Sequence, residues 1–72
     1  MSFATYLENI QEKTGLSPKQ FEALAERKGF TENGKISAGV KATVIINWLK
    51  EDYALGHGHA QAMYAYIKGK RS

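Results

Sequence analysis

The chain has 72 residues, no cysteine and a formal net charge of +3. A chain of this length forms one domain, here residues 1–72, and without cysteine it can build neither a disulfide framework nor a thiolate metal site. No apolar run approaches about 18 residues and the N-terminus lacks the form of a signal peptide, so we expect a cytoplasmic protein without a membrane-spanning helix.

The first third of the chain predicts two helices with clear ends. Residues 3–14 carry apolar side chains at helical spacing and are followed by Gly15, a residue that readily closes a helix in a left-handed conformation. A second helix is predicted over residues 18–28. Ser17 is its N-cap and Gln20, three residues later, completes a capping box.

Residues 30–39 form the one irregular segment of the sequence. Asn33-Gly34 is a strong turn signal within it. Such a turn either joins two short strands or lies in a surface loop. Because the flanking residues lack an alternating β-branched pattern, we predict a surface loop.

A third helix, predicted over residues 38–54, is apolar around more than half of its circumference. Its apolar side chains are those of Ala42, Val44, Ile45, Ile46, Trp48, Leu49 and Tyr53. A helix of this kind must be covered on several sides, so we expect it to be the central helix, with Trp48 in the middle of the core. With a last helix over residues 59–68, the sequence predicts an all-α protein, a compact bundle of four short helices.

Asp52 is predicted to have a structural role near the end of the third helix. By helical angle it falls within the apolar face, and the helix dipole disfavours a carboxylate at a C-terminal end. It therefore needs a compensating donor. The nearest in sequence are the first amides of the last helix and a ring N–H of His59.

Four segments together resemble a family of small bacterial proteins known only as a domain of unknown function. They are Y-L-E-N-I-Q-E-K-T-G at 6–15, S-P-K-Q-F at 17–21, K-G-F at 28–30 and W-L-K-E-D-Y-A-L-G-H-G-H-A at 48–60. The last block is the most specific part. The resemblance implies a helical domain in a bacterial cytoplasm, and it brings no established activity or ligand.

The chain departs from that family's pattern at Thr43-Val44, where the family more often has a glycine followed by an acidic residue. Val44 lies at the edge of the polar strip of the third helix. The apolar side chain there marks either a contact surface particular to this protein or a small variation in packing.

His57 and His59 are the residues most suggestive of chemistry. A zinc site needs three or four ligands, and only Glu51 and Asp52 lie nearby in the sequence. Histidines two residues apart in a glycine-rich turn need not point the same way. We therefore expect no metal and no cofactor. The serines are placed mainly at helix starts or at the C-terminus, so no catalytic triad is indicated and we expect no enzyme.

The turn from Gly56 to His59 has two interpretations. In the first it is an anion site, because the first amides of a helix and its dipole attract negative charge, with His57, His59 or Lys50 as added donors. In the second, Gly56 and Gly58 let two helices turn a tight corner that the histidines fill or flank. We favour the second interpretation, since helix corners use glycine routinely, and expect His57 to be the more exposed histidine.

Charge is unevenly distributed along the chain. Residues 1–26 hold four acidic and two basic side chains, whereas residues 27–72 hold eight basic and three acidic ones, including a short basic tail at 68–71. We interpret the tail as a solubilising terminus. The sequence predicts a non-enzymatic interaction module with a protein partner. The alternative is binding of nucleic acid or phosphate through the basic second half and the loop at 56–59.

Overall fold

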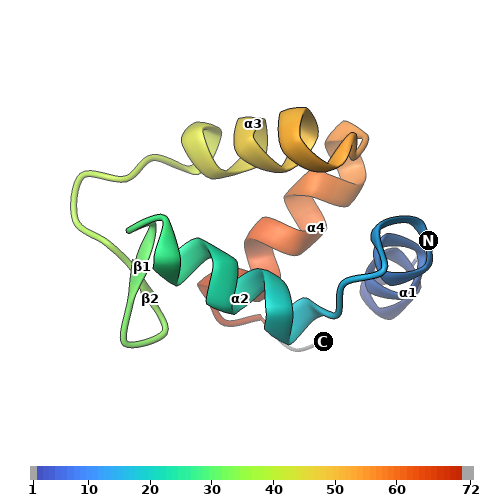
Figure 1. Cartoon of the computed structure of the whole chain (residues 1–72), viewed down its shortest axis with the longest axis horizontal. Helices are drawn as coiled ribbons and strands as arrows, with labels where there is room; N and C mark the ends of the chain where they lie inside the picture. Colours follow the sequence, from blue (N-terminus) through green and yellow to red (C-terminus); the bar gives the residue numbers. More distant parts are fainter. Residues whose placement is uncertain (1, 71–72) are drawn as a thin grey trace.

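The computed structural model of the chain describes residues 2–70. Met1, Arg71 and Ser72 of the predicted domain, and with Arg71 the end of the predicted basic tail, lie outside the described part. The elements in chain order are α1 (Phe3–Thr14), α2 (Pro18–Arg27), β1 (Thr31–Glu32), β2 (Lys35–Ile36), α3 (Ala42–Tyr53) and α4 (His57–Lys68). The predicted all-α bundle of four short helices is confirmed (Figure 1). Within the described part, every helix is too short to traverse a lipid bilayer.

The start of α2 shows how strongly local sequence determines a helix boundary. The hydroxyl of Ser17 accepts a hydrogen bond from the amide of Gln20 at 3.3 Å, and the side-chain oxygen of Gln20 accepts one from the amide of Ser17 at 2.7 Å. The predicted capping box is therefore confirmed. α1 also ends as predicted, at Gly15 in a left-handed conformation with φ of 75°.

The prediction of a surface loop around Asn33-Gly34 was wrong, because this segment forms a small antiparallel hairpin. Its strands have two residues each, with Thr31 opposite Ile36. Asn33 and Gly34 have φ values of 54° and 78°, the pair of left-handed conformations that suits a two-residue hairpin turn. Strands this short cannot show the alternating pattern whose absence argued against them.

α3 begins at Ala42, four residues later than predicted. Gly39 has a φ of 85° and Lys41 is extended, so neither residue continues a helix backwards toward residue 38. α3 is also less fully covered than its composition indicated, since the side chain of Val44 is 45% exposed.

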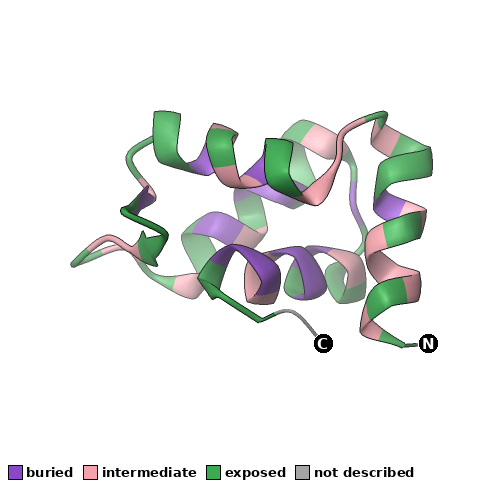
Figure 2. Cartoon of the chain, turned by 90° about the horizontal axis from the view of Figure 1, so that it is seen from below, coloured by how far each residue is buried: buried purple, intermediate pink, exposed green. Residues whose placement is uncertain are grey.

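The central helix of the bundle is α4, and the prediction that the third helix has this place was wrong. α4 packs against each of the other three helices, running behind α2 and α3 with α1 across its N-terminal end (Figure 1). Its buried residues are Ala60, Ala62, Met63, Tyr66 and Ile67. Two of these are alanines, and small side chains let neighbouring helices approach from several directions. Figure 2 shows buried residues on the sides of the helices that face one another.

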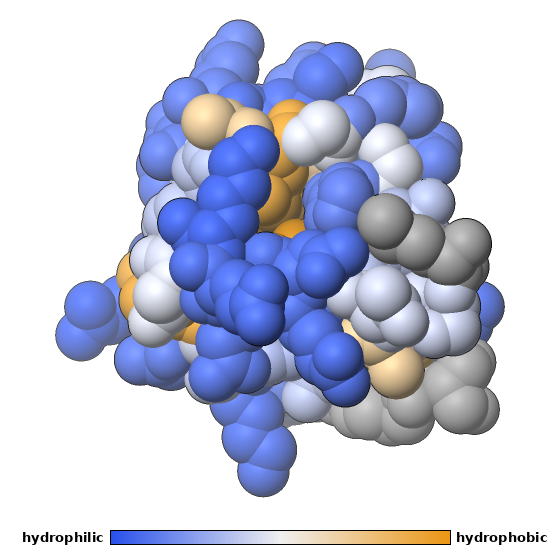
Figure 3. Space-filling view, turned by 90° about the vertical axis from the view of Figure 1, so that its right-hand side faces the viewer, coloured by the Kyte–Doolittle hydropathy of each residue, from blue (hydrophilic) through white to orange (hydrophobic). Residues whose placement is uncertain are grey.

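α1 closes one end of the bundle and turns a polar side outward. Ile10 is its one fully buried residue, while Glu8, Gln11 and Glu12 are exposed. Figure 3, which looks onto this end of the molecule, shows mostly hydrophilic residues with hydrophobic colour confined to narrow strips. The α1 end therefore presents no broad apolar surface.

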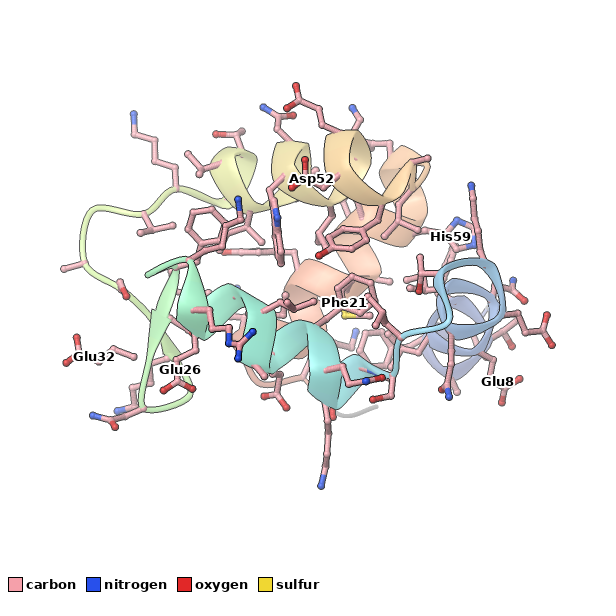
Figure 4. All side chains as sticks on the ribbon, viewed as in Figure 1. Glu8, Phe21, Glu26, Glu32, Asp52 and His59 are labelled. Carbon is pink, nitrogen blue, oxygen red and sulfur yellow. The ribbon has the colours of Figure 1, made fainter. Side chains whose placement is uncertain are left out.

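A row of four aromatic side chains fills the space between α2 and α3. Phe21 of α2 meets Tyr53 edge to face at 4.9 Å between ring centroids, Tyr53 meets Trp48 at 5.6 Å, and Trp48 meets Phe30 at 5.4 Å. Figure 4 shows Phe21 between the two helices. Trp48 is only 6% exposed, so its predicted place in the core is confirmed. Its indole N–H is buried without a hydrogen-bond partner among the described residues.

Candidate functional site

The corner between α3 and α4 contains most of the residues that the sequence singled out. α4 begins at His57, two residues earlier than predicted, with Gly56 as an extended N-cap. The first helical hydrogen bond runs from the amide of Ala60 to the carbonyl of Gly56 at 2.8 Å. Gly58 and His59 therefore lie inside the first turn of α4 rather than in a loop before it.

α1 holds this corner in place through two side chains. The ring of Tyr6 packs edge to face on His59, with 4.8 Å between centroids, and a Cβ atom at Gly58 would lie 3.4 Å from the Tyr6 hydroxyl. Lys13 donates a hydrogen bond of 2.8 Å to the carbonyl of Ala54, the left-handed residue that ends α3. Figure 4 shows His59 between the start of α4 and α1. The corner is thus a docking point for α1.

The predicted residues of the corner are brought together only in part. His59 is half-buried and His57 is exposed, which confirms the expected difference between the two histidines. Lys50 is exposed in the last turn of α3, and the lysine that reaches the corner is Lys13 instead. Sequence reasoning missed Lys13 because 41 residues separate it from Ala54, and a lysine in the last turn of α1 already has a local explanation.

The predicted partner of Asp52 was also wrong. Its carboxylate lies 3.9 Å from the ammonium group of Lys28, at the end of α2, and the two side chains are about half exposed at 51% and 49%. Figure 4 shows Asp52 on the side of α3 that faces the viewer. Burial first, and the charge of Asp52 second, raise the pKa of Tyr53 above its ordinary value. An exposed pair of this kind contributes roughly 0.2–1 kcal/mol or less.

The first turn of α4 has the geometry of a helix start without a side-chain cap. Gly56 supplies no side-chain hydrogen bond, so the first amides of α4 point outward unpaired by a cap. α3 also starts without a side-chain cap, at Lys41. The feature is therefore shared by two helices. Among residues 2–70, no three histidine, aspartate or glutamate side chains converge as ligands for a metal ion.

A different surface, which we name the α2 face, covers the outer side of α2. It consists of the exposed residues Lys19, Gln20, Ala23, Glu26 and Arg27. Ala23 lies at its centre, opposite the buried pair Phe21 and Ala25. A hollow of about 380 Å³, lined in part by Lys19 and Glu26, lies on one side of Ala23.

The second hollow of the α2 face lies on the other side of Ala23 and has a volume of about 260 Å³. It is lined by Leu16, Gln20, Ala23, Leu24 and Arg27. Both leucines are half-buried and pack against the core, so their remaining surface is accessible to another molecule. The α2 face thus has a depression on each side of Ala23, and the smaller of the two exposes apolar surface.

Two charges of the α2 face oppose the dipole of their own helix. Lys19 lies in the first turn, where the helix end is positive, and Glu26 lies in the last turn, where it is negative. Each placement is unfavourable by about 0.3–1 kcal/mol. Among the described residues neither side chain forms an ion pair that would offset this cost. Neither the dipole of α2 nor an ion pair within the described residues therefore explains these charges.

The fold and these surfaces define a small helical domain with shallow surface hollows. The chain belongs to the family described as "Domain of unknown function (DUF4287)", which matches residues 2–69. No match was found among curated proteins or among solved structures.

Proposed function

We propose that the chain is a non-enzymatic interaction module that binds a protein partner through the α2 face. The observation that carries the proposal is the pair Lys19 and Glu26, whose charges oppose the helix dipole and have no ion-pair partner within the described residues. Charges that lower the stability of a helix are expected where another molecule compensates them. We place this interaction in a bacterial cytoplasm, in line with the family resemblance and the absence of cysteine.

The shape of the α2 face supports the same proposal. Ala23 is short and its neighbours at helical spacing are long, so a ridge of side chains from a partner helix fits between them. Leu16 and Leu24 offer apolar surface, which contributes about 25 cal/mol for each Å² removed from water. Arg27 beside them is a residue type enriched in protein interfaces.

A non-enzymatic role fits the placement of the titratable groups. Catalysis requires an acid, a base or a nucleophile within hydrogen-bond reach of one enclosed site. His59 is packed against Tyr6, whereas His57 is exposed on the outside of the corner. The hollows of the α2 face are open to solvent and lined mainly by lysine, arginine, glutamate and aliphatic side chains.

Binding of phosphate or nucleic acid at the corner is less well supported by the geometry. The ring of His59 is engaged with Tyr6, and Lys50 forms no hydrogen bond or ion pair within the described residues. The uncapped start of α4 favours negative charge by itself, but the same holds for α3. This alternative therefore serves as an outcome to be tested.

The proposal is tested by comparing two variants of the tagged chain in extract of the source cell. Ala23→Arg fills the centre of the α2 face with a helix-forming residue, and Thr43→Arg makes a similar exposed change on α3. Chemical cross-linking followed by mass spectrometry identifies what each variant retains. We expect Thr43→Arg to keep the partner of the wild-type chain and Ala23→Arg to lose it. Equal retention by both variants would place the binding surface elsewhere.

A further inference from the structure

We infer that the partner seated on the α2 face is a second copy of this chain, with the two α2 helices antiparallel and crossing at Ala23. This inference rests on the proposed function of the α2 face. It follows from the positions of the charged residues around Ala23. In an antiparallel pair of α2 helices, each positive charge on one edge lies opposite a negative charge of the second copy.

The α2 face has two edges on either side of Ala23. Lys19 and Glu26 lie on one edge and line the larger hollow, while Gln20 and Arg27 lie on the other edge and line the smaller one. Glu22 also lines the larger hollow, but it is half-buried, lies about 100° around the helix from Ala23 and already has a partner within the chain. At 1.5 Å per residue, Lys19 precedes Ala23 by about 6 Å along the helix axis and Glu26 follows it by about 4.5 Å. The two charges are therefore at similar distances from the centre, on the same edge.

A twofold axis that runs two helices antiparallel brings each edge against the same edge of the second copy in reverse order. Lys19 of one copy then lies opposite Glu26 of the other, offset by only about 1.5 Å along the helix. Symmetry repeats this ion pair, so that two Lys19–Glu26 pairs flank the alanines. On the other edge, Gln20 of each copy lies opposite Arg27 of its partner, a pairing of hydrogen-bonding side chains without like charges.

The antiparallel arrangement also removes the conflict between these charges and the helix dipole. It places the positive start of one α2 beside the negative end of the other. Lys19 then faces a negative helix end and Glu26 a positive one, although each opposes its own helix. A parallel pair would set Glu26 against Arg27 of the second copy, but it would keep Lys19 near two positive helix ends. The antiparallel pair is the one that accounts for both charges.

The size of the α2 face predicts a weak dimer. Two helices that meet at alanine approach to about 8 Å between axes, and the hollows on either side of Ala23 accept the longer flanking side chains. One helix of ten residues buries less than the area of a standard stable interface. Association is therefore expected to be weak, so that the dimer is populated at high concentrations of the purified protein and is retained in extract only where cross-linking traps it.

Sedimentation velocity of the purified full chain tests this inference, at concentrations from about 10 μM to about 1 mM, where interfaces of this size associate. Lys19→Glu and Glu26→Lys each bring like charges together across the axis, so each should weaken dimerisation by about tenfold or more. The double variant restores opposite charges in exchanged positions and should return to within about threefold of the wild-type constant. Both single changes agree with the dipole of α2, so the variants should remain folded.

Two matched controls carry the same change in net charge at exposed positions outside the α2 face. Lys50→Glu lies on α3 and Glu8→Lys on α1, and both should dimerise as the wild-type chain does. Loss of dimer in these controls would show that net charge alone governs association and would overturn the inference.

Three further results would also overturn it. They are a wild-type chain that stays monomeric over the whole range, a double variant that remains as weak as the single ones, and rescue of Glu26→Lys by Arg27→Glu, which is the signature of a parallel pair. The proposed function is tested separately: if the purified chain is monomeric and yet Ala23→Arg abolishes capture of a different protein in extract, the dimer is overturned, whereas the α2 face still binds a partner. If Ala23→Arg changes neither readout, both proposals fail.

Discussion

The α3–α4 corner and the α2 face both place polar or charged groups at helix ends, but they differ in whether the chain itself supplies partners for those groups. At the corner, the chain itself supplies the contacts: Tyr6 packs on His59 and Lys13 binds the carbonyl of Ala54. On the α2 face, Lys19 and Glu26 oppose their own helix and no ion pair within the described residues compensates them.

The comparison shows that the most noticeable sequence motif need not be the binding site. Glycines alternating with histidines attract notice in a sequence, yet the contacts of α1 give Gly58 and His59 a structural explanation. Lys19 and Glu26, seven residues apart on a polar helix face, do not stand out in the sequence. Their position relative to the helix dipole and to Ala23 is what makes them candidates for binding.

The largest expected loss of stability concerns the aromatic core between α2 and α3. Trp48→Ala should lower the free energy of unfolding by about 3–5 kcal/mol, because the indole fills the space between α2 and α3. Chemical denaturation followed by circular dichroism measures this loss. Trp48→Phe keeps an aromatic ring and removes a buried N–H without a partner, so it should cost clearly less. If Trp48→Ala melts within a few degrees of the parent chain, the core is centred elsewhere.

The next effect tests whether α1 holds the corner. In Gly58→Leu the new side chain meets the Tyr6 hydroxyl, and overpacking costs about 1–3 kcal/mol, offset in part by about 1 kcal/mol of better helix propensity. We expect a lower melting temperature together with altered NMR shifts of the His59 ring. Thr43→Leu, at an exposed position of α3, is the control and should leave both unchanged. Unaltered His59 shifts in Gly58→Leu would contradict the docking of α1 at this point.

A change at the start of α2 tests the helix that carries the α2 face. Ser17→Ala removes the hydroxyl that caps the amide of Gln20 and should cost about 1 kcal/mol, which lowers the melting temperature by roughly 4–8 °C in a domain of this size. Ser37→Ala, outside any helix start, should cost less. Equal losses from the two changes would mean that the capping box contributes nothing specific to stability.

Charge reversal on the α2 face should stabilise the isolated chain. At low protein concentration, where no dimer forms, Lys19→Glu and Glu26→Lys should each raise the free energy of unfolding by about 0.3–1 kcal/mol, because each new charge agrees with the dipole of α2. Thermal melts at low ionic strength measure the gain, and added salt should reduce it. A loss of stability in either variant would show that the wild-type charge makes a stabilising contact within the chain.

The smallest expected effect is that of phosphate on the corner. Because α1 holds this corner, titration with phosphate should produce only small, unsaturable shifts of the Gly58, His59 and Ala60 amides in NMR spectra. Saturable shifts at sub-millimolar phosphate, stronger at lower pH as the histidines gain charge, would instead support the anion site. That result would make the α3–α4 corner, rather than the α2 face, the better candidate for a binding site.

Local chemistry made much of the fold predictable from the sequence. The capping box of Ser17 and Gln20 and the left-handed Gly15 depend on residues a few positions apart, so the ends they define were predicted correctly. Hydrophobic periodicity likewise placed Trp48 in the core. The hairpin at Asn33-Gly34 was missed because its turn chemistry, rather than any strand pattern, specifies it.

Only the tertiary structure decided which helix is central and how the candidate residues are used. α4 takes the centre because small buried residues such as Ala60 and Ala62 admit neighbours on several sides, a property that hydrophobic periodicity does not measure. The contact of Lys13 with Ala54 joins residues 41 positions apart, and packing alone brings them together. The sequence by itself determined the start of α2 and the end of α1, because those signals are local. The uncapped starts of α3 and α4 and the partners across the bundle depend on how the helices pack.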